Sequence, residues 1–129
     1  MFPIHAEIIP HKQQLYPTVG NYMDDKNGGK KFQISDMQNE DYAFLVLIHE
    51  MVEARLCEKA GITDEEITAF DKMFEAERDA GLHDDTEEPG CDPDAPYCQQ
   101  HMQAMKIERM VARFLGVKWS VYDRKVMSL

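Results

Sequence analysis

The sequence lacks a long hydrophobic run and has few basic residues for its number of acidic ones. Its longest apolar stretch, residues 43–48, is far too short to cross a bilayer. The first residues also lack the basic and apolar regions of a secretory signal, so we expect a cytoplasmic protein. The 24 acidic residues outnumber the 14 basic ones and give a formal net charge of −10. This charge argues against nucleic acid and an anionic membrane as partners, because both attract positive charge.

Cysteine is also scarce. The three cysteines, Cys57, Cys91 and Cys98, are an odd number, so we do not expect a framework of disulfides. The overall composition is ordinary for a globular protein, with 43% hydrophobic and 29% charged residues. The length of 129 residues fits one domain, residues 1–129, with enough chain to bury a hydrophobic core.

The first third of the chain has the pattern of β-strands. Residues 4–9, 19–23 and 30–35 are predicted strands, and the last of these alternates apolar and polar side chains. The Asn27-Gly28-Gly29 sequence between the second and third strands is a strong hairpin signal. We therefore expect a small, mainly antiparallel sheet of about three strands.

Three helices are predicted to follow the sheet. The first spans residues 39–60, with Asn39 as its N-cap, and the second spans residues 63–80, where Thr63 and Glu66 form a capping box. The third runs from residue 94 or 95 to residue 115, after a loop at residues 82–96. The expected fold class is therefore α+β, with a C-terminal tail that packs back on the body.

The first predicted helix places two candidate metal ligands on one face. His49 and Glu53 are four residues apart, so their side chains lie about one turn apart on the same side. Most of the neighbouring positions on the helix are apolar, which predicts that this face is buried. Burial of a carboxylate is unfavourable unless the group is paired, protonated or bound to a metal ion. Glu50 projects about 100° away from His49.

The third predicted helix repeats this pattern. His101 and Glu108 lie inside its apolar arc, seven residues and about two turns apart. Two packed helices that each carry an inward His and Glu would bring these side chains together. His49, Glu53 and His101 would supply two nitrogens and one carboxylate, a set that binds zinc and leaves one position for water. Glu108 is then either a fourth ligand or the acceptor that orients His101.

The motif and the order of elements resemble those of compact zincin-like metalloproteins of the gluzincin type. The resemblance implies that His49 and Glu53 are metal ligands and that Glu50 is the catalytic base. Glu53 replaces the second histidine of the His-Glu-x-x-His signature, and an anionic ligand shifts preference from zinc toward manganese or iron. The chain is also similar to a group of short phage-type proteins without known activity, through residues 8–11, 16–20, 44–53, 69–71 and 95–97 followed by His101. That similarity implies a bacterial or phage-infected host cell.

The expected function is therefore that of a divalent-metal-binding, zincin-like protein and a candidate metal-dependent hydrolase or peptidase. Zinc is the expected ion, with manganese and iron as alternatives, and Glu50 is the expected general base. The alternative is a non-catalytic module, in which the metal ties two helices together in a phage assembly or host-interaction role. Its substrate or protein partner is not specified by the sequence.

Three other interpretations of the same residues remain open. In the first, the four inward His and Glu side chains satisfy one another through hydrogen bonds without a metal. In the second, His83, Cys91, Cys98 and His101 form a soft-metal site, although their spacing is unusual for zinc. In the third, a helical bundle holds two metal ions, which usually requires more inward carboxylates. We also expect Asp71 to be solvated and Tyr97 to be a candidate donor to an oxyanion.

Overall fold

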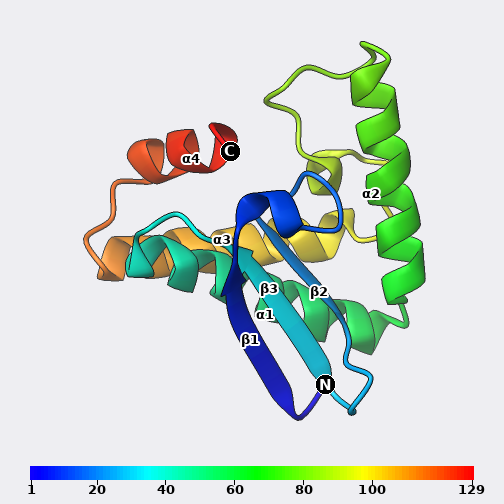
Figure 1. Ribbon diagram of the computed structural model, residues 1–129, viewed down its shortest axis with the longest axis horizontal. Helices are drawn as coiled ribbons and strands as arrows, with labels where there is room; N and C mark the ends of the chain where they lie inside the picture. The colour runs from blue at the N-terminus through cyan, green and yellow to red at the C-terminus, as the bar shows by residue number, and fades with distance from the viewer.

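The computed structural model describes all 129 residues and has an α+β fold (Figure 1). Its elements in chain order are β1 (Ile4–Ile9), the 3₁₀ turn η1 (His11–Gln13), β2 (Gly20–Asp24), β3 (Lys30–Ser35), α1 (Glu40–Ala60), α2 (Asp64–Asp79), the 3₁₀ turn η2 (Pro89–Cys91), α3 (Cys98–Phe114) and α4 (Trp119–Met127). The predicted strands and the first two helices are confirmed within one or two residues. No helix of this fold combines the length and the apolar composition that a membrane span requires.

The sheet is mixed, with the strand order β1-β3-β2, so the prediction of a mainly antiparallel sheet was wrong. β2 and β3 form the expected antiparallel hairpin, in which Gly28 and Gly29 both adopt positive φ. β1 pairs in parallel with β3, from Ile4 opposite Lys30 to Ile9 opposite Ser35. The chain reverses direction once before β2 and again in the hairpin, so β1 and β3 point the same way. Parallel and antiparallel strands show the same alternation of apolar and polar residues. The sequence therefore did not distinguish parallel from antiparallel pairing of β1 with β3.

The helix ends follow from local sequence. At the start of α1, the Asn39 side chain accepts a hydrogen bond from the backbone N–H of Tyr42. Gly61 ends this helix in the left-handed conformation. At the start of α2, Thr63 and Glu66 form both hydrogen bonds of the predicted capping box. These caps satisfy backbone groups that have no partner within the helix.

The C-terminal tail forms a fourth helix, so the prediction of three helices was wrong. α4 is short, but its Trp119, Tyr122 and Val126 recur at helical spacing and pack against the body of the protein. Tyr122 is buried and faces the interior. Packing of this face, rather than the intrinsic helix propensity of nine residues, accounts for the helix.

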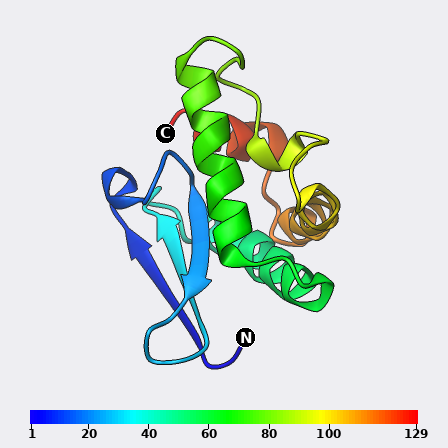
Figure 2. The ribbon, with the colours of Figure 1, turned by 90° about the vertical axis from the view of Figure 1, so that its right-hand side faces the viewer.

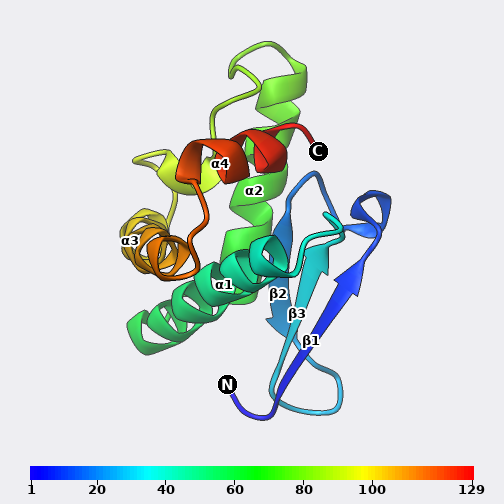
Figure 3. The same cartoon turned by 90° about the vertical axis from the view of Figure 1, so that its left-hand side faces the viewer.

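α1 lies between the sheet on one side and α3 on the other (Figure 3). α2 runs beside β2, where it borders the open edge of the sheet (Figure 2). Two apolar clusters fill the space around α1, one that includes Tyr22, Phe32 and Cys57 and one that includes Leu45 and Tyr122. α1 is therefore buried on most sides, as its composition predicts, and its polar side chains must find partners on β2 and α3.

Candidate functional site

Three side chains from α1 and α3 point at one another in the interior. Nε2 of His49 lies 3.2 Å from Oε2 of Glu53 and 3.1 Å from Nδ1 of His101. The third side of this triangle, from Nδ1 of His101 to Oε2 of Glu53, measures 2.9 Å. We call these three atoms the inner site. They could hold a divalent cation, because ligands of a tetrahedral zinc ion lie roughly 3.3 Å apart.

The helix geometry explains this convergence. His49 and Glu53 share one face of α1 because they are four residues apart, and both are buried. His101 comes from the first turn of α3, which packs against α1 along this face (Figure 3). Its side chain is only 12% exposed. The structure therefore brings His49, Glu53 and His101 together at the interface between α1 and α3, as predicted.

Glu108 lies behind His49 rather than beside His101. Its Oε1 is 2.8 Å from Nδ1 of His49, and its Oε2 accepts a hydrogen bond of 2.6 Å from the Tyr122 hydroxyl. Of the two roles expected for Glu108, that of orienting His101 is therefore wrong, because two turns of α3 separate these residues and carry Glu108 past the inner site. The position of Glu108 fixes the ring of His49 and directs Nε2 toward Glu53 and His101.

The other two members of the inner site are held in the same way. The Tyr22 hydroxyl, from β2, donates to Oε1 of Glu53 at 2.9 Å. Oε2 of Glu88 lies 3.2 Å from Nε2 of His101. Neither partner has a signal in the sequence that points to the inner site. Tyr22 resembled an ordinary core residue of a strand, and Glu88 belonged to an acidic loop with no periodicity to show its direction.

Gly90 explains how the loop reaches His101. A Cβ atom at this position would lie 2.4 Å from Cγ of the His101 ring, closer than nonbonded carbon atoms approach. The loop backbone therefore lies directly against the ring, and only glycine leaves the space for it. This contact positions both Glu88 and His101.

The charges of the inner site are strongly coupled. Burial would lower the pKa of His49, but hydrogen bonds to Glu108 and Glu53 raise it to about 10. Burial would raise the pKa of Glu53, but hydrogen bonds to His101 and His49 lower it to about 2. Without a cation, protons on the two rings thus balance the buried carboxylates.

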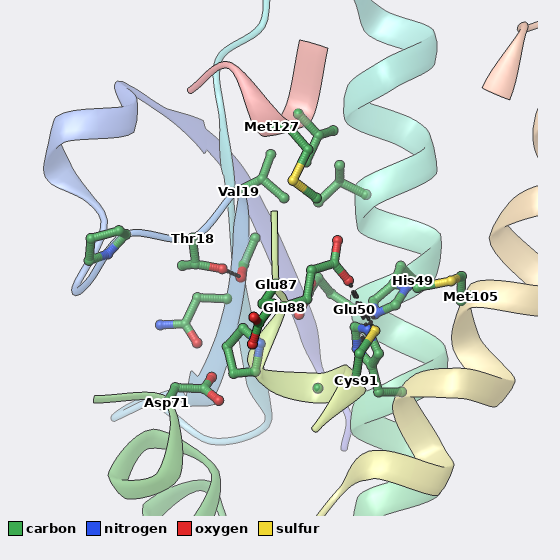
Figure 4. A pocket seen from close by; sticks show the side chains of 18 of the residues that line it. Thr18, Val19, His49, Glu50, Asp71, Glu87, Glu88, Cys91, Met105 and Met127 are labelled. Carbon is green, nitrogen blue, oxygen red and sulfur yellow. Dashed lines mark hydrogen bonds and ion pairs between the residues drawn. The ribbon is translucent and has the colours of Figure 1, made fainter. Parts of the chain in front are cut away.

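Glu50 lies in the wall of an open cleft of about 790 Å³ that includes the inner site. Figure 4 looks into this cleft, with Glu50, Glu88 and Cys91 near His49, and Asp71 across from them. The carboxylate of Glu50 packs against Gly20, where an added Cβ would lie 2.9 Å from Oε1 of Glu50. Burial, followed by the charge of Glu53, raises the pKa of Glu50 to about 8. Glu50 takes no part in the hydrogen bonds that link the inner site to Tyr22, Glu88 and Glu108.

A second buried carboxylate lies across the cleft. Asp71 of α2 accepts hydrogen bonds from the hydroxyl of Tyr16, at 2.6 Å, and from the hydroxyl of Tyr97. Asp71 is buried, so the expectation that it is solvated was wrong. The same bond directs the Tyr97 hydroxyl to Asp71 and not to the inner site. Burial is the main cause that raises the pKa of Asp71, to about 6.

The soft-metal set predicted from His83, Cys91, Cys98 and His101 is not assembled. The ring of His83 stacks on Phe74 and bonds to Glu77 and Glu87, away from the other three residues. Cys98 packs against the apolar cluster that contains Tyr22. Only Cys91 lies near His101, together with Glu88, and the ligand atoms of these three lie within 4.8 Å of one another.

Comparisons of the chain with protein-family models, with curated proteins and with solved structures found no match.

Proposed function

We propose that this protein binds one divalent metal ion at the inner site and is a zincin-like metallohydrolase that cleaves amide-like bonds. His49, Glu53 and His101 would be the ligands, and Glu50 the general base. Glu108 would orient His49 and not bind the ion. Zinc is the ion that two histidines and one carboxylate suit best, and manganese or iron also accept this set.

The observation that carries the proposal is the direction of all six polar atoms in the three ligand residues. One atom of each residue faces the centre of the triangle. The other atom has its own partner: Glu108 for His49, Glu88 for His101 and Tyr22 for Glu53. Such outer contacts fix the tautomer and the orientation of metal-binding side chains in proteins. The inner site has the contacts that a metal centre of this kind requires.

A network without metal must share protons among the same three atoms. If both His49 and His101 donate an N–H to Oε2 of Glu53, the two N–H groups face each other, with their nitrogens only 3.1 Å apart. If only His49 donates, a single N–H must serve both Oε2 of Glu53 and Nδ1 of His101. A cation in the centre gives each of the three atoms a bond of its own, because each nitrogen then presents a lone pair.

Glu50 supports the hydrolytic part of the proposal through its position. It is the residue next to His49, it lines the cleft, and it takes no part in the hydrogen bonds that fix the three ligand residues. A general base needs access to a water molecule near the reacting carbon, and the cleft provides it. A divalent ion bound beside it would lower the pKa of water and polarise a carbonyl group.

The first experiment measures metal content. The protein is purified without chelators and analysed for zinc, manganese and iron, together with Glu53→Gln, His101→Ala and the control His5→Ala. We expect one equivalent in the wild type and in His5→Ala, because His5 is exposed on β1, and a large loss in the other two. Equal metal content in all four proteins would refute the inner site.

The second experiment tests hydrolysis. The metal-loaded wild type and Glu50→Gln are incubated with a defined mixture of unstructured peptides, and new ends are identified by mass spectrometry. We expect cleavage by the wild type and a rate at least about 100-fold lower for Glu50→Gln at unchanged metal content. Equal rates would refute the role of Glu50.

The packing of α1 against α3 favours one second candidate. A metal bound by His49 and Glu53 of α1 and by His101 of α3 would tie the two helices together without catalysis. This non-catalytic module predicts the same metal content, but no cleavage by the metal-loaded wild type. The peptide experiment therefore separates the two candidates.

A further inference from the structure

We propose that Glu88, Cys91 and the Nε2 atom of His101 form a second metal site, the outer site, which competes with the inner site for His101. Oε2 of Glu88 lies 3.2 Å from Nε2 of His101 and 3.6 Å from Sγ of Cys91. The three ligand atoms lie within 4.8 Å of one another. Ligands of a tetrahedral ion lie roughly 3.3–3.6 Å apart, so closing the site requires a movement of no more than about 1.5 Å.

The local backbone brings the three side chains together. Residues 89–91 form the 3₁₀ turn η2, and the backbone N–H of Cys91 donates to the carbonyl of Glu88 at 3.0 Å. Side chains three residues apart project from the same side of such a turn. The contact of Gly90 with the His101 ring then holds both side chains at the edge of the ring.

The outer site differs from the inner site in chemistry and in exposure. Its thiol favours soft ions such as cadmium and copper(I), whereas the inner site has only nitrogen and oxygen donors. Cys91 is exposed to solvent, and His49 and Glu53 are buried. When the ion binds, the Cys91 thiol loses its proton to the solvent and the sulfur forms the bond as a thiolate.

The two sites exclude each other because they share one imidazole. A neutral histidine has one nitrogen with a free lone pair, and the other nitrogen carries hydrogen. An ion at the inner site takes the lone pair of Nδ1 and leaves Nε2–H to donate to Glu88. An ion at the outer site takes the lone pair of Nε2 and leaves Nδ1–H to donate to Glu53.

The outer site therefore acts as an exposed entrance for metal. An ion captured at Cys91 and Glu88 lies on the solvent side of His101, and a change of tautomer passes the ring's lone pair to the inner site. A soft ion that stays at Cys91 holds His101 and keeps the inner site incomplete. The competition rests on the proposed function, whereas binding at the outer site does not.

The experiment uses cadmium, whose bond to a thiolate gives an ultraviolet charge-transfer band. Metal-free wild type, Cys91→Ser, Cys98→Ser and Glu53→Gln are titrated, and bound cadmium is counted by equilibrium dialysis. We expect the band in all except Cys91→Ser. Each protein should bind one equivalent, while the double variant Glu53→Gln, Cys91→Ser should bind none. Cys91 is exposed, so its replacement leaves the fold intact.

Each result bears on a different part of the proposal. A missing band in Glu53→Gln, where no inner site competes, would refute the outer site, as would a band in Cys91→Ser. Two equivalents in the wild type would refute the sharing of His101. Loss of all binding in Cys91→Ser would refute the inner site instead and leave the outer site standing.

Discussion

Nδ1 of His49 lies 2.8 Å from Oε1 of Glu108, although the two residues are 59 positions apart in the chain. The bond crosses the interface between α1 and α3 and fixes the direction of the histidine ring. Because Nδ1 is engaged on one side, Nε2 must face Glu53 and His101 on the other. The charge of Glu108 is in turn held by the Tyr122 hydroxyl, so α4 also contributes to the geometry of the inner site.

Weakening this contact is expected to reduce metal affinity without removing the site. Glu108→Gln and Tyr122→Phe should each lower the affinity for zinc by roughly 10–100-fold at an unchanged stoichiometry of one. Calorimetric titration measures both quantities. Glu65→Gln, at an exposed position of α2, is the control and should match the wild type. An unchanged affinity in Glu108→Gln would show that the orientation of His49 does not depend on Glu108.

Metal is expected to stabilise the fold through the same residues. A free zinc concentration of about 100 times the Kd adds roughly 2.7 kcal/mol to the free energy of unfolding. For a chain of this size, that corresponds to a rise in Tm of about 10 °C. Thermal unfolding with zinc and with a chelator should show the difference in the wild type and little in Glu53→Gln. The same rise in Glu53→Gln would place the bound metal elsewhere.

Gly90→Ala is expected to disturb His101 while leaving the backbone conformation of the loop accessible. The added Cβ would overlap Cγ of His101 at 2.4 Å, so either the ring or the loop must move. The affinity for zinc should fall by at least about 10-fold, as for other changes that displace a ligand's support. Asp94→Ala, at an exposed position of the same loop, is the matched control. Equal affinities, with both proteins folded by circular dichroism, would contradict the close packing at Gly90.

Asp71 is expected to make the stability of the metal-free protein depend on pH. Burial raises its pKa from 3.8 to about 6, against the hydrogen bonds from Tyr16 and Tyr97. The folded state therefore holds this proton more tightly than the unfolded state. Its stabilising effect is complete below about pH 4 and is lost as the pH rises through 6.

Urea unfolding of the wild type and Asp71→Asn across this range measures the effect. The free energy of unfolding of the wild type, relative to Asp71→Asn, should fall by roughly 2 kcal/mol between pH 4 and pH 7. Asp79→Asn, at an exposed position of α2, controls for the loss of a surface charge. Parallel curves for the wild type and Asp71→Asn would indicate that the pKa of Asp71 is not raised.

Local sequence was enough for part of the site. The four-residue spacing of His49 and Glu53 within an apolar helix predicted that both face the interior, because helix periodicity sets side-chain direction. The same reasoning placed His101 on the inner face of α3. Helix periodicity could not give the axial position of α3 relative to α1. Glu108 was therefore paired with His101 instead of His49.

Other members of the site had no local signal. Tyr22 faces α1 because of its place in β2, but only the distance between the sheet and α1 brings its hydroxyl to Glu53. Glu88 lies in a segment without periodicity, where the path of the chain is set by the contact of Gly90 with His101. Asp71 was expected in solvent although it follows Ile67 by four residues, and the two tyrosines that cover it come from other parts of the chain.

The sequence by itself determined the three strands, α1 and α2 with their caps, and the inward direction of His49, Glu53 and His101, because these depend on interactions within a few residues. Tertiary structure decided the parallel pairing of β1 with β3, the partners of each inward side chain and the position of Cys91 beside His101. Those features depend on the relative positions of packed elements. The side chains of both elements at each interface fix these positions. The charged interior depends on both the sequence and the tertiary structure, because local periodicity buries the ionisable groups and packing supplies their partners.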